Sequence, residues 1–145
     1  LAVTLCQPNE TSKSVISNWL SFAKEKDFKQ IFIDTAEKTY TERKLKTYRP
    51  FYSILSKLTE PKNLDRFIIQ ATACLTHNAL DEISKIQCPT FVIGGDNDKI
   101  VGSSSSCELA NHIAQSKLKI YNGLGHSTYE EAKDFNSQVL SFFNN

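Results

Sequence analysis

The C-terminal part of the sequence alternates between short apolar runs typical of strands and longer repeats typical of helices. Thr90–Ile93 combines β-branched and aromatic residues, which favour a strand covered on both faces, and the two glycines that follow are expected to end it. A second strand is predicted at Leu118–Ile120, and a helical repeat at Cys107–Gln115 lies between the two strands. A strand, a crossover helix and a strand of this length form a parallel βαβ unit, so the sequence predicts an α/β fold.

Two further segments belong to the same part of the prediction. A last helix is expected from Thr128 through Phe143, and Leu1–Cys6 is a third apolar run of strand type. Capping boxes, in which an N-cap side chain and an acidic side chain bond backbone N–H groups, are expected at Ser105–Glu108 and Thr128–Glu131.

Before Ile86–Pro89 the apolar pattern is helical. Ser12–Lys24 places its apolar residues on one face of a helix, with Thr11 or Ser12 as N-cap. Further short helices are expected from the apolar residues of segments 28–35, 51–58, 67–75 and 80–83. No residue of this helical half stands out as chemically functional.

The composition is that of one ordinary soluble domain. The chain has 145 residues, of which 40% are hydrophobic and 23% charged, and a chain of this size can bury a core without disulfides or a metal. Its 17 basic residues face 16 acidic ones, for a net charge of +1, which removes the electrostatic signature of a general nucleic-acid binder. The apolar runs are far shorter than a membrane span. We therefore expect neither nucleic acid nor membrane as a partner.

The four cysteines are widely spaced and form no C-x-x-C pair. Most of them lie within apolar segments, and a chain of this length does not need a disulfide to fold. We therefore expect reduced, packed thiols and a cytoplasmic protein. They are Cys6, Cys74, Cys88 and Cys107.

Two loops at the carboxyl ends of the predicted strands hold the residues best suited to chemistry. Gly94–Val101 carries carboxylates, and Asn122–His126 ends in an imidazole just before a helix. Such loops form the ligand crevice of an open parallel sheet, and neighbouring strands lie about 4.8 Å apart. We therefore expect Asp98 and His126 to reach hydrogen-bond distance. A carboxylate that accepts the Nδ1 proton leaves Nε2 as a base.

Other features of these loops have plainer explanations. Asp96 competes with Asp98 as the acid, since either could cap the turn or be solvated. Asp96-Asn97-Asp98 lacks the glycine and the terminal glutamate of a calcium loop, and Gly123-Leu124-Gly125 lacks the third glycine of a dinucleotide fingerprint. Ser103–Ser106 is more typical of helix capping than of a nucleophile. We expect no metal and no organic cofactor. Structural or core roles are expected for His77, His112, Cys107 and the aromatic residues Trp19, Phe22, Phe28, Phe32, Phe51 and Tyr52.

The segment from Ile86 to Phe143 resembles the C-terminal end of the α/β-hydrolases. CPTFVIGG is similar to a core strand of that family, GGDNDKIV to the loop with its acid, and GLGHSTYEEAKDFNSQVLSFF to the loop with its histidine and the closing helix. The resemblance implies that Asp98, three residues after Gly95, is the acid that orients the histidine, and that His126 is the general base. It also implies a core strand at 1–6, a helical cap at 7–86 and the C-terminal half of the core at 87–145.

The G-x-S-x-G elbow that carries the nucleophile in this family does not occur in the sequence. We therefore expect the chain, which begins at Leu1 without a methionine, to be inactive alone and to belong to a longer enzyme. The resemblance implies a serine esterase- or lactonase-like hydrolase of an ester, lactone or thioester, whose nucleophile lies outside this chain.

Several alternatives stay open at this point. The same fold could serve as a non-catalytic module that binds a small ligand, or the nucleophile could be an aspartate, as in epoxide and haloalkane hydrolases. Acyl transfer to an acceptor other than water is a further alternative. The expected partners are a small acyl substrate and either the missing N-terminal portion or a second copy, because parallel strands with an unpaired edge invite pairing.

Overall fold

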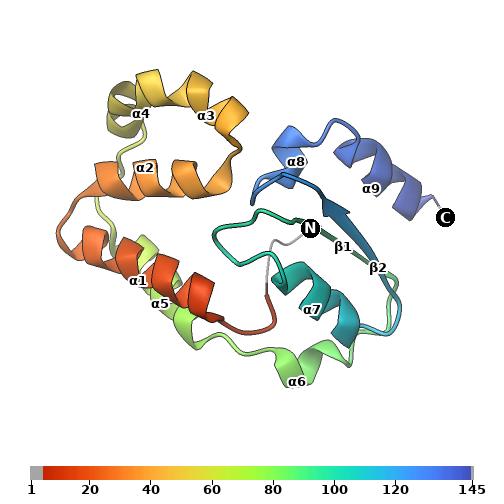
Figure 1. Ribbon diagram of the computed structural model, residues 1–145. Coiled ribbons are helices and arrows are strands. Elements are labelled where there is room, and N and C mark those ends of the chain that lie inside the picture. The colour runs from red at the N-terminus through yellow and green to blue at the C-terminus, as the bar shows by residue number, and fades with distance from the viewer. Residues whose placement is uncertain (1–4, 145) are drawn as a thin grey trace.

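The computed structural model describes residues 5–144. Figure 1 shows a helical segment, α1 to α5, beside a smaller α/β unit in which two strands lie between helices. In chain order the elements are α1 (Glu10–Lys24), α2 (Phe28–Thr39), α3 (Glu42–Tyr48), the 3-10 turn η1 (Arg49–Phe51), α4 (Tyr52–Leu58), α5 (Asp65–Thr76), α6 (Leu80–Ile83), β1 (Thr90–Gly95), α7 (Ser105–His112), β2 (Ser116–Tyr121), α8 (Thr128–Glu131) and α9 (Phe135–Phe143).

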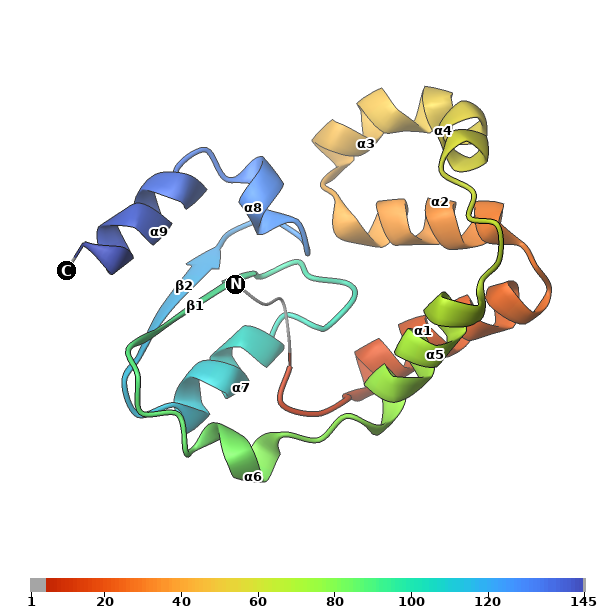
Figure 2. The ribbon, with the colours of Figure 1, turned by 180° about the vertical axis from the view of Figure 1, so that it is seen from behind.

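The two strands form the predicted parallel βαβ unit. β1 pairs with β2 in parallel, in a register that runs from Thr90 opposite Ser116 to Gly95 opposite Tyr121, and α7 provides the crossover. In Figures 1 and 2, α7 and α9 lie on opposite sides of the strands. Phe91 of β1 stacks on Phe142 of α9, with ring centroids 5.2 Å apart. The carboxyl ends of both strands therefore meet at one edge, and the loops that follow them are neighbours.

The glycines after Ile93 do not end the strand as expected, because β1 includes both of them. They are required by close packing. A Cβ atom on Gly94 would lie 2.1 Å from the Oγ atom of Ser106 on α7, and one on Gly95 would lie 2.2 Å from the carbonyl oxygen of Leu124. The crossover helix and the loop after β2 can approach the strand this closely only where side chains are absent.

The predicted strand at Leu1–Cys6 falls mostly outside the described residues, which begin at Leu5. Leu5 and Cys6 themselves lie in no strand. The carbonyl oxygen of Cys6 accepts a hydrogen bond from the N–H of Ala79 at 2.9 Å. Its side chain is fully buried with Ile83 and Ile113. This cluster joins the beginning of the described chain to α6 and to the end of α7.

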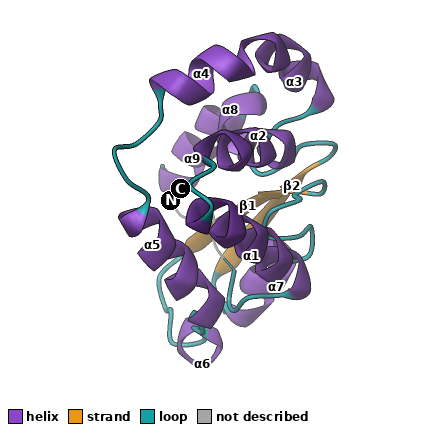
Figure 3. Ribbon diagram, turned by 90° about the vertical axis from the view of Figure 1, so that its left-hand side faces the viewer, coloured by secondary structure: helices purple, strands orange, loops and turns teal. Residues whose placement is uncertain are grey.

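The helical segment consists of packed helix pairs, as the apolar repeats predict. α1 packs against α5 and α2, and α2 packs against α4, an arrangement that Figure 3 shows from the side. Ala36, Leu45 and Tyr52 form a buried cluster between α2, α3 and α4. Sequence reasoning missed α3, because Leu45 is the buried residue of that short helix and one apolar position sets up no repeat.

The predicted starts of α1 and α7 need correction. The N-cap of α1 is Asn9, not Thr11 or Ser12: its Oδ1 accepts the N–H of Ser12 at 2.9 Å, and Ser12 Oγ accepts the N–H of Asn9 at 3.0 Å. No capping box forms at the start of α7, where the Ser105 hydroxyl instead donates to the carbonyl of Val101.

The single helix expected from Thr128 to Phe143 is divided into α8 and α9, and no capping box forms at the start of α8 either. The chain becomes extended at Ala132. Glu131 does not bond its own helix terminus, because its carboxylate accepts the N–H of Thr41 at 2.9 Å and also the Thr41 hydroxyl.

All four thiols are free, but the expectation of packed side chains holds only for some of them. Cys6 is buried and Cys107 half-buried, whereas Cys74 and Cys88 are exposed. Within residues 5–144, no helix has the length and apolar character needed to cross a bilayer.

Candidate active site

Asp98 lies in the loop that follows β1, and its side chain is only 6% exposed. The Oδ1 atom accepts hydrogen bonds from the backbone N–H groups of Ile100, at 2.8 Å, and Val101, at 3.0 Å. This local turn fixes the carboxylate, since both donors belong to the same loop. The second oxygen, Oδ2, is thereby directed away from the loop's own backbone.

His126 lies in the loop that follows β2, two residues before α8. Its Nδ1 atom is 2.9 Å from Oδ2 of Asp98, although the two residues are 28 positions apart in the sequence. The predicted meeting of these side chains is therefore confirmed. An ionised carboxylate can only accept, so this bond places a proton on Nδ1 and leaves Nε2 as an acceptor. The imidazole is 22% exposed, so its other edge is accessible.

The surroundings of Asp98 favour its ionised form. Burial alone would raise the pKa of this carboxyl, but the hydrogen bond and charge of His126 and the N–H groups of Val101 and Ile100 together lower it below its ordinary value. The side chain is thus a carboxylate at neutral pH, able to hold the imidazole and to stabilise it when it becomes protonated.

Asp96, the competing acid, has a different role. Its Oδ1 accepts the N–H of Gly123 at 2.6 Å, and the N–H of Asn97 donates to the carbonyl of Leu124 at 3.0 Å. These bonds tie the loop after β1 to the loop after β2. Asp96 therefore caps a turn and helps to hold the two loops together, while Asp98 contacts the imidazole.

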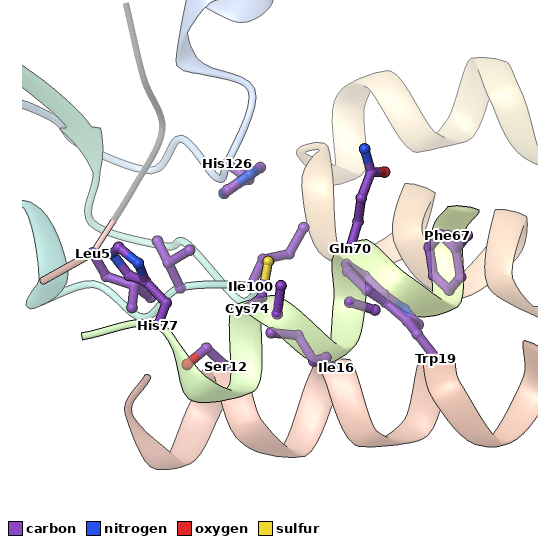
Figure 4. A pocket seen from close by; sticks show the side chains of 13 residues that line it. Leu5, Ser12, Ile16, Trp19, Phe67, Gln70, Cys74, His77, Ile100 and His126 are labelled. Atoms are coloured by element: carbon purple, nitrogen blue, oxygen red, sulfur yellow. The ribbon is translucent and has the colours of Figure 1, made fainter. Parts of the chain in front are cut away.

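His126 stands where two cavities of the described chain meet. A cavity of about 520 Å³ lies between α1, α5 and the loop after β1, and one of about 800 Å³ lies among the helices α1 to α5 and α8. Figure 4 shows the smaller cavity, with Trp19 and Phe67 at one end, His77 and Leu5 at the other, and His126 on the facing wall. Four residues line both cavities: Trp19, Phe67, Ile100 and His126.

The expectation of core roles for the aromatic residues holds for Tyr52, which is buried in the cluster with Ala36 and Leu45, and is wrong for Phe51, which is 52% exposed. Trp19, Phe28, Phe32 and Tyr52 line the larger cavity, whereas Phe22 and Phe51 line neither. Helical spacing could not reveal this, since a residue facing a cavity and one facing a packed core occupy the same side of a helix. Phe67, which also faces both cavities, carries no sequence signal beyond an apolar repeat.

The remaining candidates have structural contacts or none that suggests chemistry. His112 Nδ1 is 2.8 Å from the carbonyl oxygen of Glu108 in its own helix. His77 is exposed at the end of α5 and lines the smaller cavity. Ser105 is buried, and its Oγ accepts from the side chain of Asn9 at 3.1 Å. Among residues 5–144 there is no group of three or more His, Cys, Asp or Glu side chains placed to hold a metal ion.

Residues 57–133, which include both Asp98 and His126, match the family model described as serine aminopeptidase, S33 (Hydrolase_4). The chain belongs to this family. It is 32% identical over 89 residues to 2-hydroxy-6-oxononadienedioate/2-hydroxy-6-oxononatrienedioate hydrolase 2 of Pseudomonas putida, an alignment that covers 59% of this chain and 31% of that protein. The matches span between about a fifth and a third of the length of the curated relatives.

Solved structures show the fold over almost the whole chain. An α/β hydrolase from a Medee basin deep-sea metagenome library aligns with a TM-score of 0.85 and 22% identity, over 98% of this chain and 54% of that one. The enol-lactonase of Burkholderia xenovorans LB400 aligns with a TM-score of 0.81 and 17% identity, over 98% of this chain and 54% of the lactonase. The α/β-hydrolase fold implied by the resemblance is confirmed, and the curated relative is itself a hydrolase.

Proposed function

We propose that this chain supplies the acid and the base of an enzyme that hydrolyses an ester, lactone or thioester bond, and that the rest of the protein supplies a serine nucleophile. The observation that carries the proposal is the bond between a buried, fixed carboxylate and an imidazole that lines two cavities. A structural histidine needs no such cavity. A ligand-binding module has no need for a carboxylate that fixes one tautomer of the imidazole.

In the proposed reaction, His126 moves the protons while Asp98 keeps the imidazole in place. Nε2 accepts the proton of the serine hydroxyl as its oxygen bonds to the acyl carbon, and then gives this proton to the departing alcohol or thiol. Water attacks the acyl-enzyme, Nε2 takes a proton from that water, and this proton returns to the serine oxygen as the carboxylic acid is released. The Asp98 carboxylate stabilises the imidazolium in both halves of the reaction.

The helical segment 10–76 serves in this proposal as the cap over the reacting bond. Its helices provide most of the lining of both cavities, and the core contributes His126 together with Ile100 and a few neighbours. Among the described residues, those that line the two cavities include no Asp, Glu, Lys or Arg. The cap is therefore suited to an uncharged apolar substrate, in contrast to the dioates named for the Pseudomonas putida relative.

The test is the Asp98→Asn variant of the full-length enzyme, assayed on neutral esters. An amide at this position favours the wrong tautomer of His126, so we expect kcat to fall by about four orders of magnitude, the effect of the corresponding change in other serine hydrolases. Asp81→Asn, at an exposed position of α6, is the matched control and should keep its activity. Unchanged turnover in Asp98→Asn would reject the assigned role.

A fluorophosphonate probe separates this proposal from its alternatives. Labelling of one serine, lost when that serine is replaced by alanine, supports the serine mechanism. A covalent ester on an aspartate after incubation with an epoxide or a haloalkane would instead identify an aspartate nucleophile. Tight retention of a ligand with neither labelling nor turnover would identify a binding module.

A further inference from the structure

Trp19 stands at the boundary between the two cavities. It lines both the cavity of about 520 Å³ and the one of about 800 Å³, together with Phe67 and Ile100. The three side chains come from α1, from α5 and from the loop after Asp98. They therefore form a divide that reaches from the helical segment to the core, with the candidate base, His126, beside it.

The indole of Trp19 is held in place from a neighbouring helix. Its Nε1–H donates to Oδ2 of Asp34 on α2 at 2.7 Å. The other carboxylate oxygen of Asp34 accepts from Lys38, one helical turn further along α2. Because both oxygens of Asp34 have partners, the acceptor cannot rotate freely, and the indole ring is fixed at its polar edge.

We propose that Trp19 is a specificity-determining residue that separates the two arms of the substrate, one in each cavity, with the scissile bond at His126. This inference rests on the proposed hydrolysis. The preferred substrate then has an uncharged acyl arm and an uncharged leaving-group arm, and each arm has its own length limit. Asp34 is a positioning residue that acts through Trp19.

The test compares two ester series on the full-length enzyme, one with acyl chains of increasing length and one with alcohols of increasing length. In Trp19→Ala the divide is lost, so esters beyond either length limit should gain in kcat/KM relative to short ones. A misfit of one methylene in an apolar pocket changes selectivity by roughly 10-fold to 200-fold, which sets the size of the expected shift. The same length profile in both proteins would overturn the proposal.

Matched variants keep the test informative. Phe22 lies on the same helix as Trp19, and its ring lines neither cavity. The length profile of Phe22→Ala should therefore equal that of the wild type. Asp34→Asn keeps an acceptor for the indole and should also keep the profile, whereas Asp34→Leu should shift it towards that of Trp19→Ala. Lys38→Met removes the other partner of Asp34 and controls for the lost ion pair. If Trp19→Ala does not fold, Trp19→Phe provides the smaller version of the same change.

A binding experiment separates failure of this inference from failure of the proposed hydrolysis. Hexanamide and 1-hexanol, as neutral mimics of the two arms, should bind the wild type at the same time, as followed by ligand-observed NMR. Simultaneous binding without any ester turnover would reject the hydrolysis and leave the divide standing. Mutual competition of the two ligands in an active enzyme would reject the divide alone.

Discussion

Replacement of Gly95 by alanine should separate the two candidate catalytic side chains without touching either of them. A Cβ atom at Gly95 would lie 2.2 Å from the carbonyl oxygen of Leu124 and 2.5 Å from that of Gly125. Ordinary contact begins at 3.4 Å, so the backbone just before His126 must retreat by about 1.2 Å. The Nδ1–Oδ2 bond, 2.9 Å long, cannot survive a shift of this size.

Two magnitudes follow from that displacement. Overpacking at a tight backbone contact costs about 1–3 kcal/mol of stability. A misplacement of about 1 Å in a catalytic group costs roughly 100-fold in rate. We therefore expect Gly95→Ala to fold with reduced stability and to lose about 100-fold in kcat.

The assay needs a variant with a comparable loss of stability and an intact loop. Gly123→Ala meets this need, because Gly123 has a φ of +74° but nothing lies within 4 Å of the added Cβ, so the cost is backbone strain of about 1–2 kcal/mol. Thermal unfolding should show both variants destabilised. In Gly95→Ala alone, the downfield proton resonance of His126 Nδ1–H should be lost and kcat for esters should fall by about 100-fold. An unchanged Nδ1–H resonance in Gly95→Ala would refute the reasoning.

Three further outcomes are expected. The pKa of Asp98 is lowered on folding. Its contribution to the free energy of unfolding is therefore full above about pH 4 and is lost as the pH falls through the depressed pKa. The stability difference between wild type and Asp98→Asn, measured by urea unfolding, should shrink below that pH. Burial, followed by the charge of Glu130, raises the pKa of Tyr40 to about 12, and burial, followed by its hydrogen bond to Glu37, raises the pKa of Tyr52 to about 12. The ultraviolet absorbance of ionised tyrosine should therefore show a late phase that Tyr40→Phe reduces and that the double variant Tyr40→Phe, Tyr52→Phe reduces further. Asn9→Ala loses an N-cap and a side-chain bond of 2.7 Å to the carbonyl of Val101, so the protein should lose about 1–2 kcal/mol of stability. Lys13→Ala loses only an exposed ion pair with Glu10 and should change stability by under about 1 kcal/mol.

The contact between Asp98 and His126 was predictable because local patterns determine it. Two short strands, a crossover helix and the parallel rule place the two loops at one edge of the sheet, and few residues in those loops can ionise. The choice of Asp98 over Asp96 was not decided by the loops alone, since it came from the family resemblance. In the structure, hydrogen bonds decide it, because Asp96 is occupied by Gly123 N–H.

Most of the errors fall where distant segments determine local structure. The expected C-terminal helix is interrupted after Glu131, whose carboxylate bonds Thr41, 90 positions earlier in the chain. Trp19 was assigned to the core, because a helical repeat carries no information about what lies opposite. No short window of sequence contains the partner of Glu131 or the groups opposite Trp19. One error was local: the N-cap of α1 was assigned two or three residues too late, although Asn9 bonds Ser12 within the same turn.

The seam between helical segment and core has a consequence for any attempt to dissect the protein. The carbonyl oxygen of Thr39 accepts a hydrogen bond from the N–H of Ser127 at 3.3 Å. At the start of α3, the side chain of the N-cap residue Thr41 makes no capping bond, and the N–H of Thr41 donates to the carboxylate of Glu131. A recombinant fragment that ends at residue 86 would therefore lack the carboxylate that accepts the N–H of Thr41 at the start of α3. The complementary fragment would keep the Glu131 carboxylate without its two donors on Thr41. We therefore expect neither fragment to fold stably alone, although the sequence pattern changes at residue 86.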